Sequence, residues 1–96
     1  MPTAPKSPGS VQTFRALADA NRLRILDLLG NGELYAQEIV GRLGTAQSAV
    51  SRHLAILERA RLVTVRPRRG MKYYAVNPER MDAIADLLRT RGQSET

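Results

Sequence analysis

The sequence contains no cysteine and no tryptophan, and it has a single histidine. The lack of cysteine excludes disulfides, thiolate zinc sites, cysteine nucleophiles and thiol redox switches. The longest uninterrupted apolar run has four residues, as at positions 54–57, so we expect no membrane span and no membrane partner. The opening segment, MPTAPKSPGS, has no hydrophobic core and is not expected to act as a secretory signal. These absences favour a cytoplasmic protein.

Positive charge is concentrated in the middle of the chain. The 96 residues suit one small domain and carry a net charge of +6. Residues 36–76 hold eight bases and two acids, which is the whole of that net charge. A basic patch attracts a polyanion and releases condensed counterions when it binds. Thirteen arginines against two lysines also fit an arginine-rich composition, so charge alone leaves a merely solvated surface open.

The amino-acid composition divides the chain into three segments. Residues 1–9 contain three prolines and no apolar periodicity, which predicts a disordered N-terminal arm. Residues 92–96 are expected to form a flexible tail. The domain itself is predicted over residues 10–91.

Four stretches before residue 61 show apolar residues at helical spacing. The first expected helix begins after the N-cap Ser10 and carries Val11, Phe14, Leu17 and Ala18. The second is Ala20–Leu29 with Asp19 as its cap, and the third is a short one from Leu34 to Gly44. The fourth is about Ala46–Ala60, with Thr45 as its cap.

The spacing of the apolar residues changes from that of a helix to that of a strand after residue 61. Residues 62–66 and 71–76 are rich in β-branched and aromatic residues, and Gly70 between them suits a left-handed turn position. Tyr73 and Tyr74 must face opposite sides of their strand, so one of them packs on the core. A last amphipathic helix is expected over Glu79–Arg91. The fold class is therefore mostly α with a small β-hairpin, in the order α-α-α-α-β-β-α, which is a winged helix-turn-helix with five helices.

The helix at 46–60 has the pattern of a DNA-reading helix. Its predicted buried stripe is Val50, Leu54 and Leu57, and its opposite face is short and polar. The candidate major-groove residues are Gln47, Ser48, Ser51 and Arg52. Glutamine pairs with an adenine edge and arginine with a guanine edge, while serines allow close approach. An ordinary surface helix is the alternative.

The hairpin and the ends of this helix supply candidate contacts to the DNA backbone or the minor groove. These are Thr45, His53, Arg66, Arg68, Arg69 and Lys72. A solvated turn is the alternative for the hairpin. His53 has no nearby metal-ligand partners, and for it both a phosphate contact and a supporting hydrogen bond stay open.

Several stretches together resemble the ArsR/SmtB family of bacterial repressors. They are Phe14-Arg15-Ala16-Leu17-Ala18-Asp19, Arg22-Leu23-Arg24-Ile25-Leu26, Ser48-Ala49-Val50-Ser51-Arg52-His53-Leu54 and Leu57-Glu58-Arg59-Ala60-Arg61-Leu62-Val63. The resemblance implies a homodimer built from the first and last helices, operator binding to double-stranded DNA, and release by an effector. Its groove-reading positions correspond to Gln47, Ser48, Ser51 and Arg52, and its wing to residues 66–72.

The sequence departs from the family pattern at three places. Arg61 stands where the family commonly has glycine after the reading helix. Glu33-Leu34 is followed by Tyr35-Ala36-Gln37 in place of the Cys-x-Cys metal ligands. The last helix offers Asp82 and Asp86 but no histidine for the second family metal site. We therefore expect no metal and no cofactor, and the effector is unidentified.

Dimerisation also follows from the apolar pattern. The first and last helices carry stripes that so small a domain cannot bury internally. The predicted interface residues are Val11, Phe14, Ala18, Met81, Ile84 and Leu88. A two-fold dimer predicts an inverted-repeat operator.

The predicted function is a dimeric, sequence-specific transcriptional regulator, expected to be a repressor. The alternative is a winged-helix module that binds an acidic protein partner. The sequence has no nucleophile–base pair, phosphate loop or cofactor fingerprint, so we do not expect an enzyme.

Overall fold

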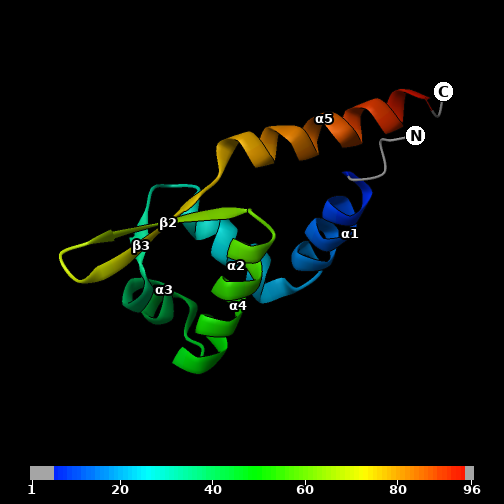
Figure 1. Cartoon of the computed structure of the whole chain (residues 1–96). Coiled ribbons are helices and arrows are strands. Elements are labelled where there is room, and N and C mark those ends of the chain that lie inside the picture. The colour runs from blue at the N-terminus through cyan, green and yellow to red at the C-terminus, as the bar shows by residue number, and fades with distance from the viewer. Residues whose placement is uncertain (1–5, 95–96) are drawn as a thin grey trace.

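The computed structural model describes residues 6–94, with side chains described from residue 11 to residue 89. Its elements are α1 (Lys6–Leu17), α2 (Ala20–Leu29), β1 (Leu34–Tyr35), α3 (Ala36–Leu43), α4 (Gln47–Arg59), β2 (Val63–Arg68), β3 (Met71–Val76) and α5 (Pro78–Ser94). Figure 1 shows α2, α3 and α4 gathered into a body from which the β2–β3 hairpin projects. The predicted fold class, with four helices, a hairpin and a last helix, is confirmed.

The sheet has one strand more than the sequence predicted. Leu34 and Tyr35 form β1, which pairs antiparallel with β3 through Leu34↔Tyr74 and Tyr35↔Tyr73, and the strand order is β1-β3-β2. The prediction that a helix begins at Leu34 was therefore wrong, since α3 begins at Ala36. A strand of two residues is too short to show a period, and its partner lies far along the chain.

The outer helices are longer than expected. Helix α1 begins at Lys6 rather than after Ser10, so it includes residues 6–9 of the expected N-terminal arm. Proline at position 8 is compatible with this because the first turn of a helix leaves its backbone N–H groups without intrahelical partners. Helix α5 continues to Ser94 and includes residues 92–94 of the expected tail. The predictions for residues 1–5 and 95–96 lie outside the described residues.

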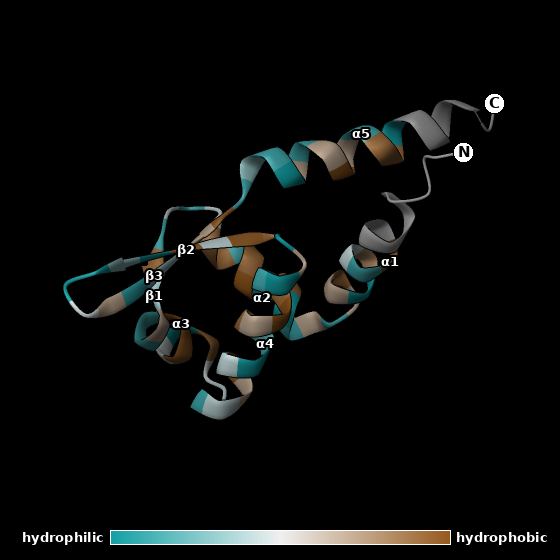
Figure 2. Cartoon of the chain, viewed as in Figure 1, coloured by the Kyte–Doolittle hydropathy of each residue, from teal (hydrophilic) through white to brown (hydrophobic). Residues whose placement is uncertain are grey.

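The core lies where α2, α3, α4 and the start of β2 meet. Ile25, Ile39, Leu57 and Leu62 have no exposed surface. Figure 2 shows hydrophobic stretches along both α2 and α4. The predicted stripe of Val50, Leu54 and Leu57 is confirmed, because each of these residues is at most 2% exposed.

The predicted helix ends at Asp19 and Gly44 are confirmed. The Asp19 carboxylate accepts hydrogen bonds from the backbone N–H groups of Asn21 and Arg22, at 2.9 and 3.2 Å, and so caps α2. Gly44 ends α3 with a φ of +71°, a left-handed conformation that favours glycine. The prediction that Thr45 caps α4 was wrong. Ala46 occupies the N-cap position, and no side chain caps that helix.

Arg61 ends the reading helix in a strained conformation. Its φ is +65°. The backbone N–H of Leu62 donates to the carbonyl of Leu57 and that of Arg61 to Glu58, both at 2.9 Å, which is the Schellman arrangement. The Asn77 side-chain amide donates to the Arg61 carbonyl at 3.0 Å and so ties this turn to the start of α5. An arginine therefore adopts a backbone conformation that glycine takes without steric cost.

Arg61→Gly should stabilise the protein. Glycine removes the steric cost of the left-handed conformation but gains freedom in the unfolded chain, so the net gain is about 0.5–1 kcal/mol in the free energy of unfolding. Urea denaturation measures it. Arg59→Gly, at the last residue of α4, is the matched control in right-handed helical conformation and should destabilise by about 0.5–1 kcal/mol. Equal losses in both variants would contradict this account of Arg61.

Candidate nucleic-acid interface

Helix α4 presents a polar edge to solvent. Gln47, Ser48, Ser51 and Arg52 are all exposed. With 3.6 residues per turn, these positions share one side of the helix, and the buried stripe occupies the other. Because that stripe packs into the core, the polar edge is held outward. The four residues predicted to read the major groove therefore lie together on one accessible face.

His53 does not lie on that face. It is only 6% exposed and belongs to the inner side of α4. This placement does not favour the predicted contact to the DNA backbone, because little of the ring is open to a phosphate. The alternative, a supporting hydrogen bond, is what the side chain makes. Thr45, also predicted as a backbone contact, is half-buried in the turn between α3 and α4.

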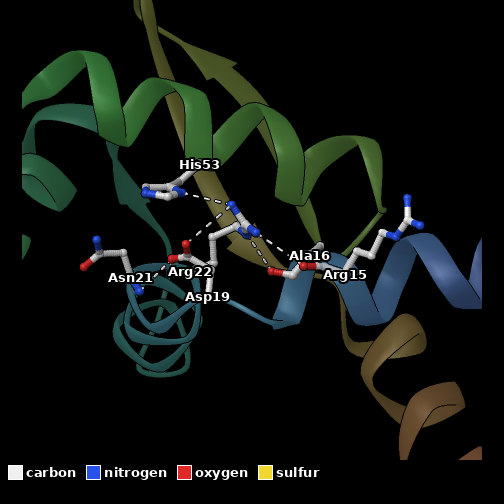
Figure 3. A network of polar contacts seen from close by, with 6 residues as sticks. All are labelled: Arg15, Ala16, Asp19, Asn21, Arg22 and His53. Carbon is white, nitrogen blue, oxygen red and sulfur yellow. Dashed lines mark hydrogen bonds and ion pairs between the residues drawn. The ribbon is translucent and has the colours of Figure 1, made fainter.

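A polar network joins His53 to the corner between α1 and α2 (Figure 3). Its centre is the guanidinium of Arg22, whose Nη1 lies 3.2 Å from His53 Nδ1. The same guanidinium donates from Nε to the Ala16 carbonyl at 2.6 Å and from Nη2 to the Arg15 carbonyl at 3.3 Å. Asp19 Oδ2 lies 4.0 Å from Arg22 Nη1. The hydrogen bond that the Arg22 backbone N–H donates to Asp19 is the main reason why the pKa of the Asp19 carboxyl lies below its usual value.

Strands β2 and β3 form the predicted wing. Their two-residue turn is Arg69-Gly70, with φ values of +53° and +78°. Positive φ at both central residues is the type I′ pattern, whose twist matches that of the strands. The prediction of a left-handed Gly70 is confirmed. All four predicted wing bases, Arg66, Arg68, Arg69 and Lys72, are exposed. Figure 2 shows the projecting tip as strongly hydrophilic.

Two of these basic residues contact a glutamate that was not among the predicted site residues. Glu33, just before β1, forms ion pairs with Arg66 at 3.2 Å and with Arg68. The Arg66 hydrogen bond, followed by that of Arg68, holds the pKa of the Glu33 carboxyl below its usual value. No local pattern reveals these contacts, because they depend on β1 lying beside β3.

An aromatic pair lies next to these ion pairs. The rings of Tyr35 and Tyr73 meet edge to face with centroids 5.7 Å apart. The guanidinium carbon of Arg68 lies 4.2 Å from the centroid of the Tyr73 ring, within cation–π range. Tyr74, on the opposite side of β3, packs against the core as one of the two tyrosines was predicted to do. The outer face of the sheet thus holds Arg68 between a carboxylate and a ring.

The predicted interface residues on the outer helices leave apolar surface open. Val11, Phe14 and Leu88 are 53%, 38% and 56% exposed. Ala18 is also exposed, whereas Met81 and Ile84 are half-buried against the core. Helix α5 extends away from the body in Figure 1. Its first turn is held to α1 by a hydrogen bond from Arg80 Nη2 to Thr13 Oγ1 at 2.9 Å.

Among the described residues, no three His, Asp or Glu side chains gather as metal ligands. Within the same part of the chain, none of the helices combines the length and apolar character needed to cross a membrane.

Comparisons with known proteins agree with this geometry. Residues 19–65 match the profile described as "Bacterial regulatory protein, arsR family". The transcriptional activator HlyU of Vibrio cholerae is 37% identical over 82 residues, which cover 85% of this chain and 76% of that protein. The chain belongs to the arsR family. An arsenical resistance operon repressor of Staphylococcus xylosus, another similar protein, is 35% identical over 83 residues, covering 83% of this chain and 80% of the repressor.

Solved structures give the same arsR-type fold. The structure of HlyU from Vibrio cholerae superposes with a TM-score of 0.74 at 34% identity, covering 94% of this chain and 96% of that one. A winged helix-turn-helix DNA-binding domain from Mycobacterium bovis, described as homodimeric, superposes with a TM-score of 0.77 at 26% identity, covering 97% and 89%. This arsR-family chain is therefore a winged helix-turn-helix protein.

The Glu33 carboxyl should titrate below the range of an ordinary glutamate. Its two arginine partners favour the charged form, so the stability it contributes is present above the unfolded-state pKa and is lost as pH falls through the lowered folded-state pKa. Carbon-detected NMR of the side-chain carboxyl follows the titration. Arg66→Ala and Arg68→Ala should each raise the pKa, whereas Arg69→Ala, a turn residue without this ion pair, should leave it unchanged. A titration that is the same in all four proteins would show that the ion pairs do not form in solution.

Proposed function

We propose that this arsR-family protein is a dimeric, sequence-specific DNA-binding transcriptional regulator, expected to act as a repressor on an inverted-repeat operator. The observation that carries the proposal is the exposed polar edge of α4, opposite a wholly buried stripe and in the same domain as a cationic hairpin. A helix of this kind fits the major groove, and a basic hairpin beside it meets the sugar-phosphate backbone or the minor groove.

Each residue of the edge has its own role in this proposal. Arg52 pairs with a guanine edge and Gln47 with an adenine edge, because both side chains match those edges with two hydrogen bonds. Ser48 and Ser51 bond to bases or phosphates and keep the helix surface low enough for close approach. These four side chains distinguish one sequence from another.

The wing supplies affinity without sequence information. Arg66, Arg68, Arg69 and Lys72 contact phosphates or enter the minor groove, and each neutralised phosphate releases counterions. In the free protein Glu33 already pairs with two of these arginines. Binding therefore exchanges a carboxylate partner for phosphates at Arg66 and Arg68, whereas Arg69 and Lys72 bring new charge to the duplex.

A second copy of the chain completes the binding unit. The open apolar positions on α1 and α5, above all Val11, Phe14 and Leu88, support a two-fold interface formed by these helices. Two reading helices related by a two-fold axis lie about one helical turn of DNA apart, which calls for two half-sites of opposite orientation. The similar domain from Mycobacterium bovis is described as a homodimer, which also supports this arrangement.

The proposal assigns no catalytic activity and no cofactor, and it assigns the protein to the cytoplasm. Similar proteins are named both as activator and as repressors. Repression is expected here where the operator overlaps the promoter. A signal that releases the DNA would have to act without the cysteine ligands of the metal-sensing relatives, because the sequence has none.

Arg52→Ala and Arg68→Ala should have different effects on DNA binding. Arg52→Ala should cost about 1–3 kcal/mol on the operator and reduce the preference for it over other duplexes. Arg68→Ala should weaken all duplexes alike and make the dependence of affinity on salt shallower. The operator is first found by sequencing genomic fragments that the purified protein captures, and affinities are then measured over a series of salt concentrations. Identical behaviour of the two variants would contradict the division of roles, and equal weak binding of the parent protein to every duplex would contradict the function.

Leu88→Lys should separate the dimer. A charged side chain in an apolar interface leaves an unpaired charge without water, and the half-exposed position in a single chain tolerates it. Light scattering after size-exclusion chromatography should give a mass near twice 10.6 kDa for the parent and near 10.6 kDa for the variant. Arg89→Ala, at an exposed neighbouring position on α5, is the control and should stay dimeric. A dimeric Leu88→Lys protein would argue for another interface.

A further inference from the structure

We propose that Arg22 and His53 form a positioning pair that holds the reading helix in its DNA-binding orientation, and that this pair works only while His53 is neutral. The inference rests on the proposed function and adds a pair of residues that lie behind the reading face. The observation is the contact between Arg22 Nη1 and His53 Nδ1 at 3.2 Å, made by a histidine that is 6% exposed.

The chemistry of the two side chains fixes the protonation state of the ring. A guanidinium has five N–H donors and no acceptor, so it can only donate in this contact. His53 Nδ1 must then present a lone pair, which leaves the proton of the neutral ring on Nε2. Protonation of Nδ1 would place two donors and two positive charges against each other. The hydrogen bond therefore exists only with the neutral imidazole.

The pair connects the reading helix to a fixed point of the fold. Arg22 is itself held by the carbonyls of Ala16 and Arg15 at the end of α1, at 2.6 and 3.3 Å (Figure 3). His53 follows Arg52 directly along α4, so its ring anchors the turn that carries Arg52 and Ser51. Helix α4 has no side-chain cap at its N-terminus, and its inner contacts are otherwise apolar and not directional. The Arg22–His53 bond is thus a directional contact that sets how α4 is rotated.

Acid should break this contact. Among the described residues, the charged groups that interact with His53 are Arg22 at the start of α2 and the Asp19 carboxylate beside it. Asp19 accepts from the backbone N–H groups of Asn21 and Arg22 at Oδ1, and its Oδ2 lies 4.0 Å from Arg22 Nη1, beyond hydrogen-bond distance. It therefore does not replace the acceptor that is lost when the ring is protonated. As pH falls, the population with the bond, and with it DNA affinity, should decrease.

The sign of this effect separates a positioning role from a phosphate contact. A histidine that touched the DNA backbone would bind more tightly when protonated, because it would add a positive charge. A positioning histidine should weaken binding under the same conditions. The chain has a single histidine, so its titration can be isolated by substitution.

The test measures operator affinity and thermal unfolding between about pH 8 and about pH 5.5. The probe is the duplex captured from the genome by the parent protein. For the parent we expect affinity to fall about tenfold, the effect of losing one hydrogen bond to a charged group, together with a lower unfolding temperature at acid pH. His53→Asn places an uncharged oxygen near the position of Nδ1, so it should bind well at both pH values and lose most of the pH dependence. His53→Leu removes the acceptor and should bind weakly at both. Arg52→Ala should bind more weakly than the parent yet keep the same acid sensitivity.

Each outcome either supports or overturns the proposed role of the Arg22–His53 pair. Affinity of the parent that rises or stays constant on acidification overturns the proposal, as does a His53→Asn protein with the pH dependence of the parent. Unfolding temperatures report on the pair without DNA. If the parent bound no duplex selectively, the proposed function would fail, while a loss of stability at acid pH in the parent but not in His53→Asn would still support the bond. If that difference in stability were also absent, the pair itself would be refuted.

Discussion

Burial of one side of α4 is the constraint on which the functional surface depends. Val50, Leu54 and Leu57 are at most 2% exposed, and a helix cannot bury these positions without turning Gln47, Ser51 and Arg52 outward. The core contacts of α4 therefore decide which side chains are offered to a partner. Because the helix also needs a fixed rotation about its axis, a directional contact at His53 adds what apolar packing alone supplies weakly.

The sequence predicted those parts of the molecule that depend on local pattern. The stripe of α4, the Asp19 cap, the left-handed Gly70 and the order of elements all follow from spacing and residue type within a few positions. The departures have equally local reasons where a rule was applied too strictly. Ala46 rather than Thr45 is the N-cap of α4, and a proline in the first turn did not stop α1 from starting at Lys6.

The contacts missed in the sequence join residues that are far apart along the chain. Glu33 meets Arg66 and Arg68 because the two-residue strand β1 pairs with β3, and Arg22 meets His53 across 31 positions. Neither contact has a period or a motif, so only the folded chain reveals it. The direction of His53, in contrast, follows from helical spacing. The residue lies three positions after Val50 and four before Leu57, and therefore on the buried side of α4, although Arg52 beside it is exposed.

The distribution of aromatic residues gives the protein a built-in optical reporter. The chain has no tryptophan, and its three tyrosines, Tyr35, Tyr73 and Tyr74, all lie in strands β1 and β3. Its intrinsic tyrosine emission therefore comes from the sheet alone. Tyr73 is covered by the Arg68 guanidinium and touches the ring of Tyr35, so any partner that draws Arg68 away changes the surroundings of an emitting ring. Movements of the wing can thus be followed in the unlabelled protein, whereas rearrangements confined to the two outer helices leave the emission unchanged.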